Sequence, residues 1–179
     1  MIKKILILFF LLAASVNNAQ TKFSVGGNFG IGQIKGNSPT ITSLAWKFYV
    51  DAHFDFLPAV SIAASFIYAQ HTDKFIPGDK TNRYFPFIKA YAITVNNVLY
   101  LNEMIFIKSG IGGNYVNERI FSGESNWEFG FSFFTSPGLD FRGEEENGFT
   151  LNASFDFGMT FSGNAPSYFL FTIGTEYYF

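Results

Sequence analysis

Two histidines and the acids near them are the residues whose spacing could support chemistry. His53 stands between Asp51 and Asp55, and in an extended strand these alternate residues share one face. A carboxylate beside an imidazole is the orienting half of a Ser/His/Asp arrangement. Because strand alternation alone creates such neighbours, a structural role for His53 is favoured, and catalysis is the alternative. The serines that could act as its nucleophile are Ser24, Ser61 and Ser65.

The second histidine begins a polar segment. His71 and Asp73 could bind a metal ion or a lipid headgroup there, but one imidazole and one carboxylate form a weak ligand set. The chain has no cysteine, which removes thiolate ligands and disulfides. We therefore predict neither a metal nor a cofactor, and a solvated loop at His71.

Composition narrows the class of protein. Of the 179 residues 48% are hydrophobic, which excludes disorder, and 25 are phenylalanine. The net charge is -2 with only 12 Lys and Arg, so the basic field that nucleic-acid binding requires is missing. Beyond the N-terminus no apolar run approaches the roughly 18 to 20 residues of a spanning helix.

The N-terminus predicts export. Lys3 and Lys4 precede an apolar stretch, residues 5–14, and small or polar residues follow to Gln20. This order is typical of a secretory signal peptide, and the stretch is too short for a spanning anchor, the alternative reading. We predict a cleaved signal peptide over residues 1–20 and a single domain over residues 21–179.

Hydrophobic residues alternate along the remainder of the chain. From Phe149 to Phe161 every second residue is apolar and the intervening residues are polar or glycine, a period that excludes an amphipathic helix. The same period predicts eight strands in all, over residues 22–31, 46–56, 60–69, 85–101, 105–117, 129–142, 149–161 and 168–179.

Short and long connections alternate between these segments. Turns at residues 57–58, 102–104 and 143–148 alternate with polar loops at 33–43, 70–84, 118–127 and 163–167. This alternation is typical of an all-β, eight-stranded antiparallel up-and-down transmembrane β-barrel. The pattern slips at Asn96–Asn97, which predicts a bulge, and Pro137 predicts a bulge or an early strand end.

The chemistry of the two faces distinguishes a membrane barrel from a soluble lipocalin-like carrier. The polar face is mainly Ser, Thr, Asn and Gly, which suits the crowded interior of a small barrel rather than a wet exterior. The apolar face carries aromatic residues near both ends, as interface belts do. The predicted belts are Trp46, Phe48, Tyr115, Trp127, Phe129 and Phe169 on the loop side, and Phe23, Phe56, Phe141, Phe149, Tyr177 and Phe179 on the turn side.

The last strand ends in a pattern that resembles the assembly signal of bacterial outer-membrane barrels. Phe171, Ile173, Tyr177 and the terminal Phe179 are alternate apolar residues, and Thr175 is the mild departure. Over the whole mature chain the sequence resembles the small OmpA/OmpX-type barrels, including PorT-like proteins. The resemblance implies an outer-membrane location, contact with outer-membrane lipid and lipopolysaccharide, and insertion by the barrel-assembly machinery.

Ionisable residues fall on the inward face. We expect Lys22 to meet Glu176 where the first and last strands close the barrel, and Arg142 and Lys108 to balance the interior aspartates. A structural plug of ion pairs is favoured over a selective pore or a proton-sensitive gate, because eight strands leave little room for solute. The predicted network is Lys22, Lys47, Asp51, His53, Asp55, Lys108, Asp140, Arg142, Asp156 and Glu176.

A fold does not specify a task, so the function must be argued from the surfaces that the barrel presents. The favoured hypothesis is a non-enzymatic outer-membrane barrel whose loops serve envelope integrity, adhesion or binding of an extracellular or periplasmic protein. Residues 75–77 offer an apolar contact patch for this role. The alternatives are a lipid A-modifying enzyme, a deacylase or acyltransferase, and the passage of small hydrophobic compounds.

Overall fold

This computed structural model describes residues 21–36, 39–78, 83–119, 125–143, 147–163 and 165–179. The predicted signal peptide over residues 1–20 lies outside the described residues. Within the described part of the chain, no helix has the length and hydropathy needed to cross a membrane.

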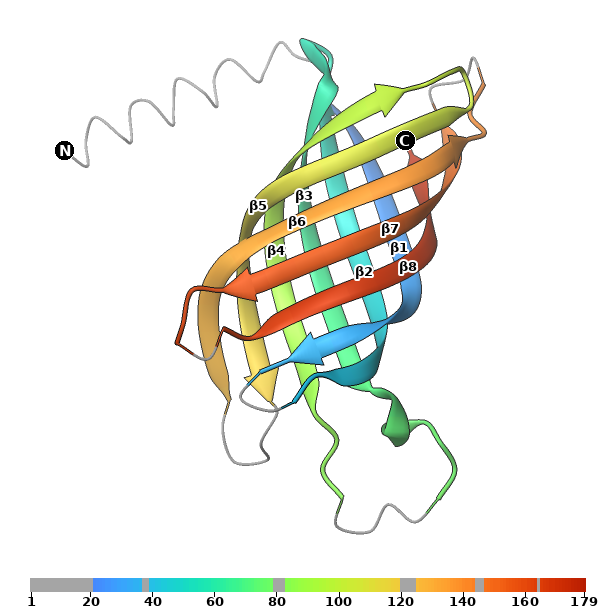
Figure 1. The fold of residues 1–179 in the computed structure, drawn as a ribbon. Helices are drawn as coiled ribbons and strands as arrows, with labels where there is room; N and C mark the ends of the chain where they lie inside the picture. The colour runs from blue at the N-terminus through green and yellow to red at the C-terminus, as the bar shows by residue number, and fades with distance from the viewer. Residues whose placement is uncertain (1–20, 37–38, 79–82, 120–124, 144–146, 164) are drawn as a thin grey trace, which may run out of the picture.

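Eight antiparallel strands form a closed barrel in which each strand pairs with its neighbours in sequence (Figure 1). Pairing between the first and last strands completes the closure, so the predicted all-β up-and-down architecture is confirmed. The strands are β1 (Thr21–Lys35), β2 (Ile41–Phe54), β3 (Leu57–His71), β4 (Phe87–Tyr100), β5 (Ile105–Arg119), β6 (Asn126–Asp140), β7 (Gly148–Thr160) and β8 (Ser167–Tyr178).

The two ends of the barrel differ in their connections. At one, here called the turn end, the strands are joined by residues 55–56, 101–104 and 141–147, and the C-terminus lies there. At the other, the loop end, the β3–β4 connection is the longest and contains the short 3-10 helix η2 (Thr72–Lys74). Figure 1 shows this loop at the pole opposite the C-terminus. The predicted turn at residues 57–58 is instead the start of β3.

The outer wall is apolar and rich in aromatic residues. In β7 every residue predicted to face outward is more accessible than the buried residues between them. Aromatic rings touch across strands near both ends: Tyr115 lies 4.5 Å from Phe129 at the loop end, and Phe149 lies 4.6 Å from Tyr177 at the turn end. Such contacts between ring centroids are favourable beyond the area that they bury.

Inside the barrel, aromatic side chains lie over glycines of the neighbouring strand. A Cβ placed on Gly26 would overlap the ring of Tyr49, its direct cross-strand partner, and one on Gly158 would overlap Tyr168. Phe134 over Gly110 and Phe106 over Gly138 repeat the arrangement. Interior glycines therefore provide the space in which large rings fold against the wall.

Two predicted irregularities are resolved by the register. Pairing is continuous through Asn96 and Asn97 on both sides of β4, so the expected bulge there is absent; a register shift lies at His53/Phe54 instead. Pro137 neither bulges nor ends β6. It pairs with β5, but Ser136 and Pro137 have no partner in β7, and pairing resumes in the same register at Gly138. A proline has no N–H to donate, which accounts for an interrupted ladder.

The glycine and aromatic pairs predict a contrast between two substitutions. Gly158→Val forces a side chain into the space of the Tyr168 ring, and overpacking of this kind costs about 1–3 kcal/mol. Gly113→Val is the control, because a Cβ there meets only the Gly130 carbonyl oxygen, at 3.9 Å. Urea titration followed by heat-modifiable gel migration should show a lower midpoint for Gly158→Val alone. Equal midpoints would contradict this account of the interior.

Candidate functional site: the barrel interior

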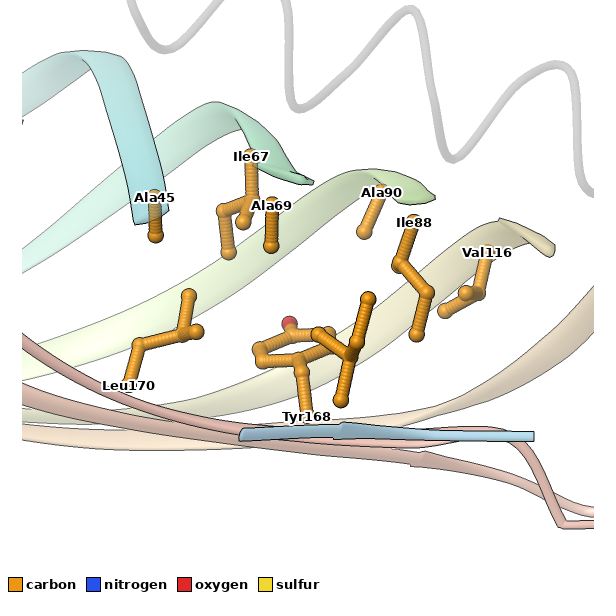
Figure 2. Packing of buried hydrophobic residues seen from close by; sticks show 9 residues of the cluster. Ala45, Ile67, Ala69, Ile88, Ala90, Val116, Tyr168 and Leu170 are labelled. Carbon is orange, nitrogen blue, oxygen red and sulfur yellow. The ribbon is translucent and has the colours of Figure 1, made fainter. Parts of the chain in front are cut away.

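The loop end of the interior is closed by apolar side chains. Tyr168 and Leu170 of β8 face residues from the opposite wall, and Figure 2 shows these side chains converging. Sequence analysis did not predict this cluster, because apolar residues occur on both faces of the strands here and weaken the period of two. Its members are Ile34, Ala45, Ile67, Ala69, Ile88, Ala90, Val116, Tyr168 and Leu170.

The turn-end half of the interior is polar and is organised around one ammonium group. Lys108 Nζ lies 2.5 Å from Asp51 Oδ2 and 2.9 Å from Glu176 Oε1, and all three side chains are buried. Asn96 Nδ2 donates to both oxygens of Asp51, at 3.2 and 3.4 Å. A buried charge is tolerated only where a partner and hydrogen bonds replace its water, and Lys108 supplies both carboxylates with that partner.

Two further ion pairs complete the interior charges. Lys47 Nζ lies 2.5 Å from Asp156 Oδ1, and Ser154 donates to the other oxygen of Asp156 at 2.8 Å. Near the turn end, Arg142 Nη2 lies 2.6 Å from Asp140 Oδ2, and its guanidinium stacks over the Tyr178 ring at 3.8 Å. The partner of Asp156 is therefore Lys47 rather than Lys108 or Arg142.

Of the three remaining members of the predicted network, Lys22 and Asp55 lie at the rim. Lys22 Nζ is 3.9 Å from Asp55 Oδ1, with side chains that are 36% and 46% exposed, so this pair is a weak surface interaction. The expectation that Lys22 meets Glu176 is wrong in register, because Glu176 lies opposite Gly26 and Tyr178 lies opposite Ser24. Strands β1 and β8 do meet, but Lys108 is the cation that reaches Glu176.

His53 reaches a serine hydroxyl, as the catalytic alternative requires. Its Nε2 lies 2.9 Å from Ser24 Oγ. However, Ser24 Oγ donates its single proton to Glu176 Oε1 at 2.5 Å, so the imidazole must donate to the hydroxyl rather than accept from it. A Ser/His pair in catalysis needs the opposite polarity. Ser24 is also fully buried, which keeps a substrate carbonyl away from the oxygen.

The same residues bring three metal-ligand atoms together. Asp51, His53 and Glu176 each offer one possible ligand atom, and these three atoms lie within 4.8 Å of one another. Lys108 Nζ already contacts both carboxylates, so an ammonium occupies the position that a metal ion would need. The geometry therefore fits an ion pair with a neighbouring imidazole better than a metal centre.

His71 is the last residue of β3 at the loop end, and Asp73 lies in η2 at the start of the β3–β4 loop. Nδ1 of His71 is 4.0 Å from Asp73 Oδ2, and the imidazole stacks with Phe85 at 6.5 Å. The Asp73 side chain is 60% exposed. Asp73 thus lies in a solvated loop as predicted, whereas His71 ends a strand with a side chain that is only 21% exposed, and no third ligand joins the pair among the described residues.

A small cavity lies between the apolar cluster and the charges, lined by residues of both sets, such as Tyr168 and Lys108. Its volume is about 30 Å³, and its lining includes Asn28, Asn96 and Ser132, each with a buried oxygen that lacks a protein partner among the described residues. A polar cavity of this size holds one or two waters, which would satisfy such atoms. It is far smaller than the clefts of several hundred Å³ that hold small-molecule ligands.

Some members of the network escaped the sequence reading. Tyr49 donates to Glu176 Oε2 at 3.3 Å. The ring centroid of Tyr178 lies 5.0 Å from that of His53. Tyr100 donates to Asp140 at 3.0 Å. Alternation places all three on the inward face, but the predicted network contains only Lys, Arg, His, Asp and Glu side chains and therefore left the tyrosines out.

Removing the central ammonium predicts a large loss of stability. Lys108→Met leaves Asp51 and Glu176 buried side by side without a cation, and breaking a buried pair costs about 3–5 kcal/mol. Lys22→Met, the matched control at the exposed rim, should cost less than about 1 kcal/mol. Urea unfolding in detergent measures both, and a Lys108→Met midpoint equal to that of the control would refute the assigned role.

Comparison with known proteins places this geometry in a structural class. No protein-family model and no curated protein matches the chain. The structure is similar to the crystal structure of Neisserial surface protein A, with a TM-score of 0.65 and 8% identity over 89% of this chain and 99% of that one. It is also similar to Ail, the attachment invasion locus protein of Yersinia pestis, with a TM-score of 0.55 and 15% identity over 89% and 97% of the two chains. The chain thus has the fold of the small eight-stranded outer-membrane barrels.

Proposed function

We propose that this protein is a non-enzymatic outer-membrane barrel that acts through its exterior, in envelope integrity, adhesion or partner binding. The observation that carries the proposal is the closed interior: the apolar cluster seals the loop end, and ion pairs occupy the turn-end half. Because the described residues leave only a small cavity inside, the loops and the outer wall are the surfaces left for function. The same packing argues against passage of small hydrophobic compounds.

The β3–β4 loop is the strongest candidate for a binding surface. Phe75 and Ile76 are 47% and 56% exposed, and the Phe75 ring lies 5.8 Å from Trp46 of the outer wall. The returning arm of the loop is tethered, because Gln70 Nε2 donates to the carbonyls of Phe85 and Pro86 at 2.9 and 3.1 Å. The loop therefore presents an apolar patch from a fixed base. Ail, a structural neighbour, has been crystallised with a heparin analogue, which supports a binding role for such barrels.

Outer-membrane lipid, including lipopolysaccharide, is the partner proposed for the wall. Lys89 Nζ lies 5.3 Å from the Phe87 ring centroid, and Arg119 lies 6.0 Å from it, both on the outward face near the loop end. Neither cation has a carboxylate partner among the described residues. Cations beside aromatic residues at the membrane interface attract anionic headgroups.

The loop proposal is tested by Phe75→Ser combined with Ile76→Ser. We expect attachment of expressing cells to host-cell layers to fall about tenfold, because apolar residues at an interface centre contribute most of the binding energy. Leu101→Ser is the control, since it removes an equally exposed apolar residue from the turn end. Heat-modifiable migration checks folding. Unchanged attachment together with unchanged detergent resistance of the cells would contradict the proposal.

A lipid A-modifying activity is the second candidate, favoured by the 2.9 Å approach of His53 to Ser24. We expect the lipid A mass spectrum to be the same for cells with the wild-type protein, with Ser24→Ala and without the gene, because the Ser24 proton is held by Glu176. A mass shift that depends on Ser24 would establish the enzyme and overturn the non-enzymatic proposal.

A further inference from the structure

The outer wall carries a row of polar side chains on three neighbouring strands. The register pairs Asn97 of β4 with Ser109 of β5, and Ser109 with Thr135 of β6. All three belong to the outward-facing series of their strands, in which the adjacent positions on each strand point into the barrel. They therefore form one continuous polar row across β4, β5 and β6.

This row lies within the apolar wall and not at its rim. On each of the three strands an apolar residue flanks the row on both sides along the same outward face. A carboxamide surrounded in this way lacks the water that would hydrogen bond to it, and polar groups facing hydrocarbon are costly unless they find a partner. The flanking residues are Val95, Ile111 and Phe133 toward the loop end, and Leu99, Ile107 and Pro137 toward the turn end.

The members of the row differ in how they are satisfied. Ser109 Oγ and Thr135 Oγ1 are 3.1 Å apart and hydrogen bond to each other. The exposed carboxamide of Asn97 makes no hydrogen bond with any described residue. Asn97 thus presents two donor hydrogens and an acceptor oxygen outward, with nothing in the barrel to receive them.

An interrupted ladder lies beside the same row. Thr135 pairs with Phe155 of β7, but the next two residues of β6, Ser136 and Pro137, have no β7 partner. Pro137 has no N–H to donate to β7, which accounts for this gap, so it adds an irregularity beside the row and not a second unsatisfied group. The unpaired carboxamide of Asn97 is the observation on which the inference rests.

We propose that this part of the wall is the contact with a second copy of the chain in the membrane. Two copies inserted in the same orientation are related by a two-fold axis along the membrane normal, so a residue near the axis meets itself at the same depth. A carboxamide is self-complementary, because its N–H₂ can donate to the oxygen of its symmetry mate. Two Asn97 side chains thus satisfy each other through reciprocal hydrogen bonds, whereas a different protein would have to present a matching group at that depth.

Cross-linking tests the proposal, because the natural chain contains no cysteine. Val95→Cys introduces a thiol two residues from Asn97 on the same face, about 7 Å along the strand, within reach of a short bismaleimide across the axis. Val25→Cys on β1, three strands away around the barrel, is the matched control, since Val95 and Val25 are 53% and 47% exposed. We expect a dimer-sized product in intact outer membranes for Val95→Cys and none for Val25→Cys.

Adding Asn97→Leu to Val95→Cys should lower the cross-linked fraction about fivefold, since a polar side-chain contact between membrane-embedded segments contributes only modestly to the free energy of association. Leucine suits a lipid-facing position, and heat-modifiable migration verifies folding; Asn97→Ala replaces it if migration is altered. Four results would each overturn the proposal. The first two are no product from Val95→Cys and equal products from both cysteines. The other two are a yield that Asn97→Leu leaves unchanged and a product in which mass spectrometry finds another protein.

Discussion

Hydrogen bonding between β1 and β8 is the constraint on which the rest of this structure depends. A chain in hydrocarbon must satisfy its own backbone groups, and an open sheet would leave two edges without partners. Twelve residue pairs, from Ser24↔Tyr178 to Lys35↔Ser167, close the barrel. Closure at eight strands in turn sets a narrow interior, in which side chains from opposite walls must fit against one another.

The two ends of this narrow interior are filled by different kinds of side chain. At the loop end apolar side chains such as Tyr168 and Leu170 pack into a sealed cluster. At the turn end the buried carboxylates Asp51 and Glu176 share the ammonium of Lys108, which removes the cost of isolated charge. The proton of Ser24 is committed to Glu176, so the approach of His53 to Ser24 is part of the same stabilising network.

The exterior is consistent with the lipid contact proposed for it. Aromatic residues and alternate apolar side chains suit lipid, and the cations Lys89 and Arg119 lie where headgroups would meet the wall. The row that begins at Asn97 departs from this rule. A polar group in an apolar wall is stable only with a partner, which is why the departure points to protein contact rather than to lipid.

The sequence by itself determined the strand number, the closed all-β architecture and the two faces of the clearly alternating strands such as β7, because alternation with period two is a local property of extended backbone. It also identified most of the inward charges, such as Lys47 and Asp156. Only the tertiary structure decided which charges meet, because partners such as Lys108 and Glu176 come from distant strands whose stagger depends on closure. The sealed loop end, the absence of a bulge at Asn97 and the alignment of Asn97 with Ser109 and Thr135 were likewise products of register, which no single strand encodes.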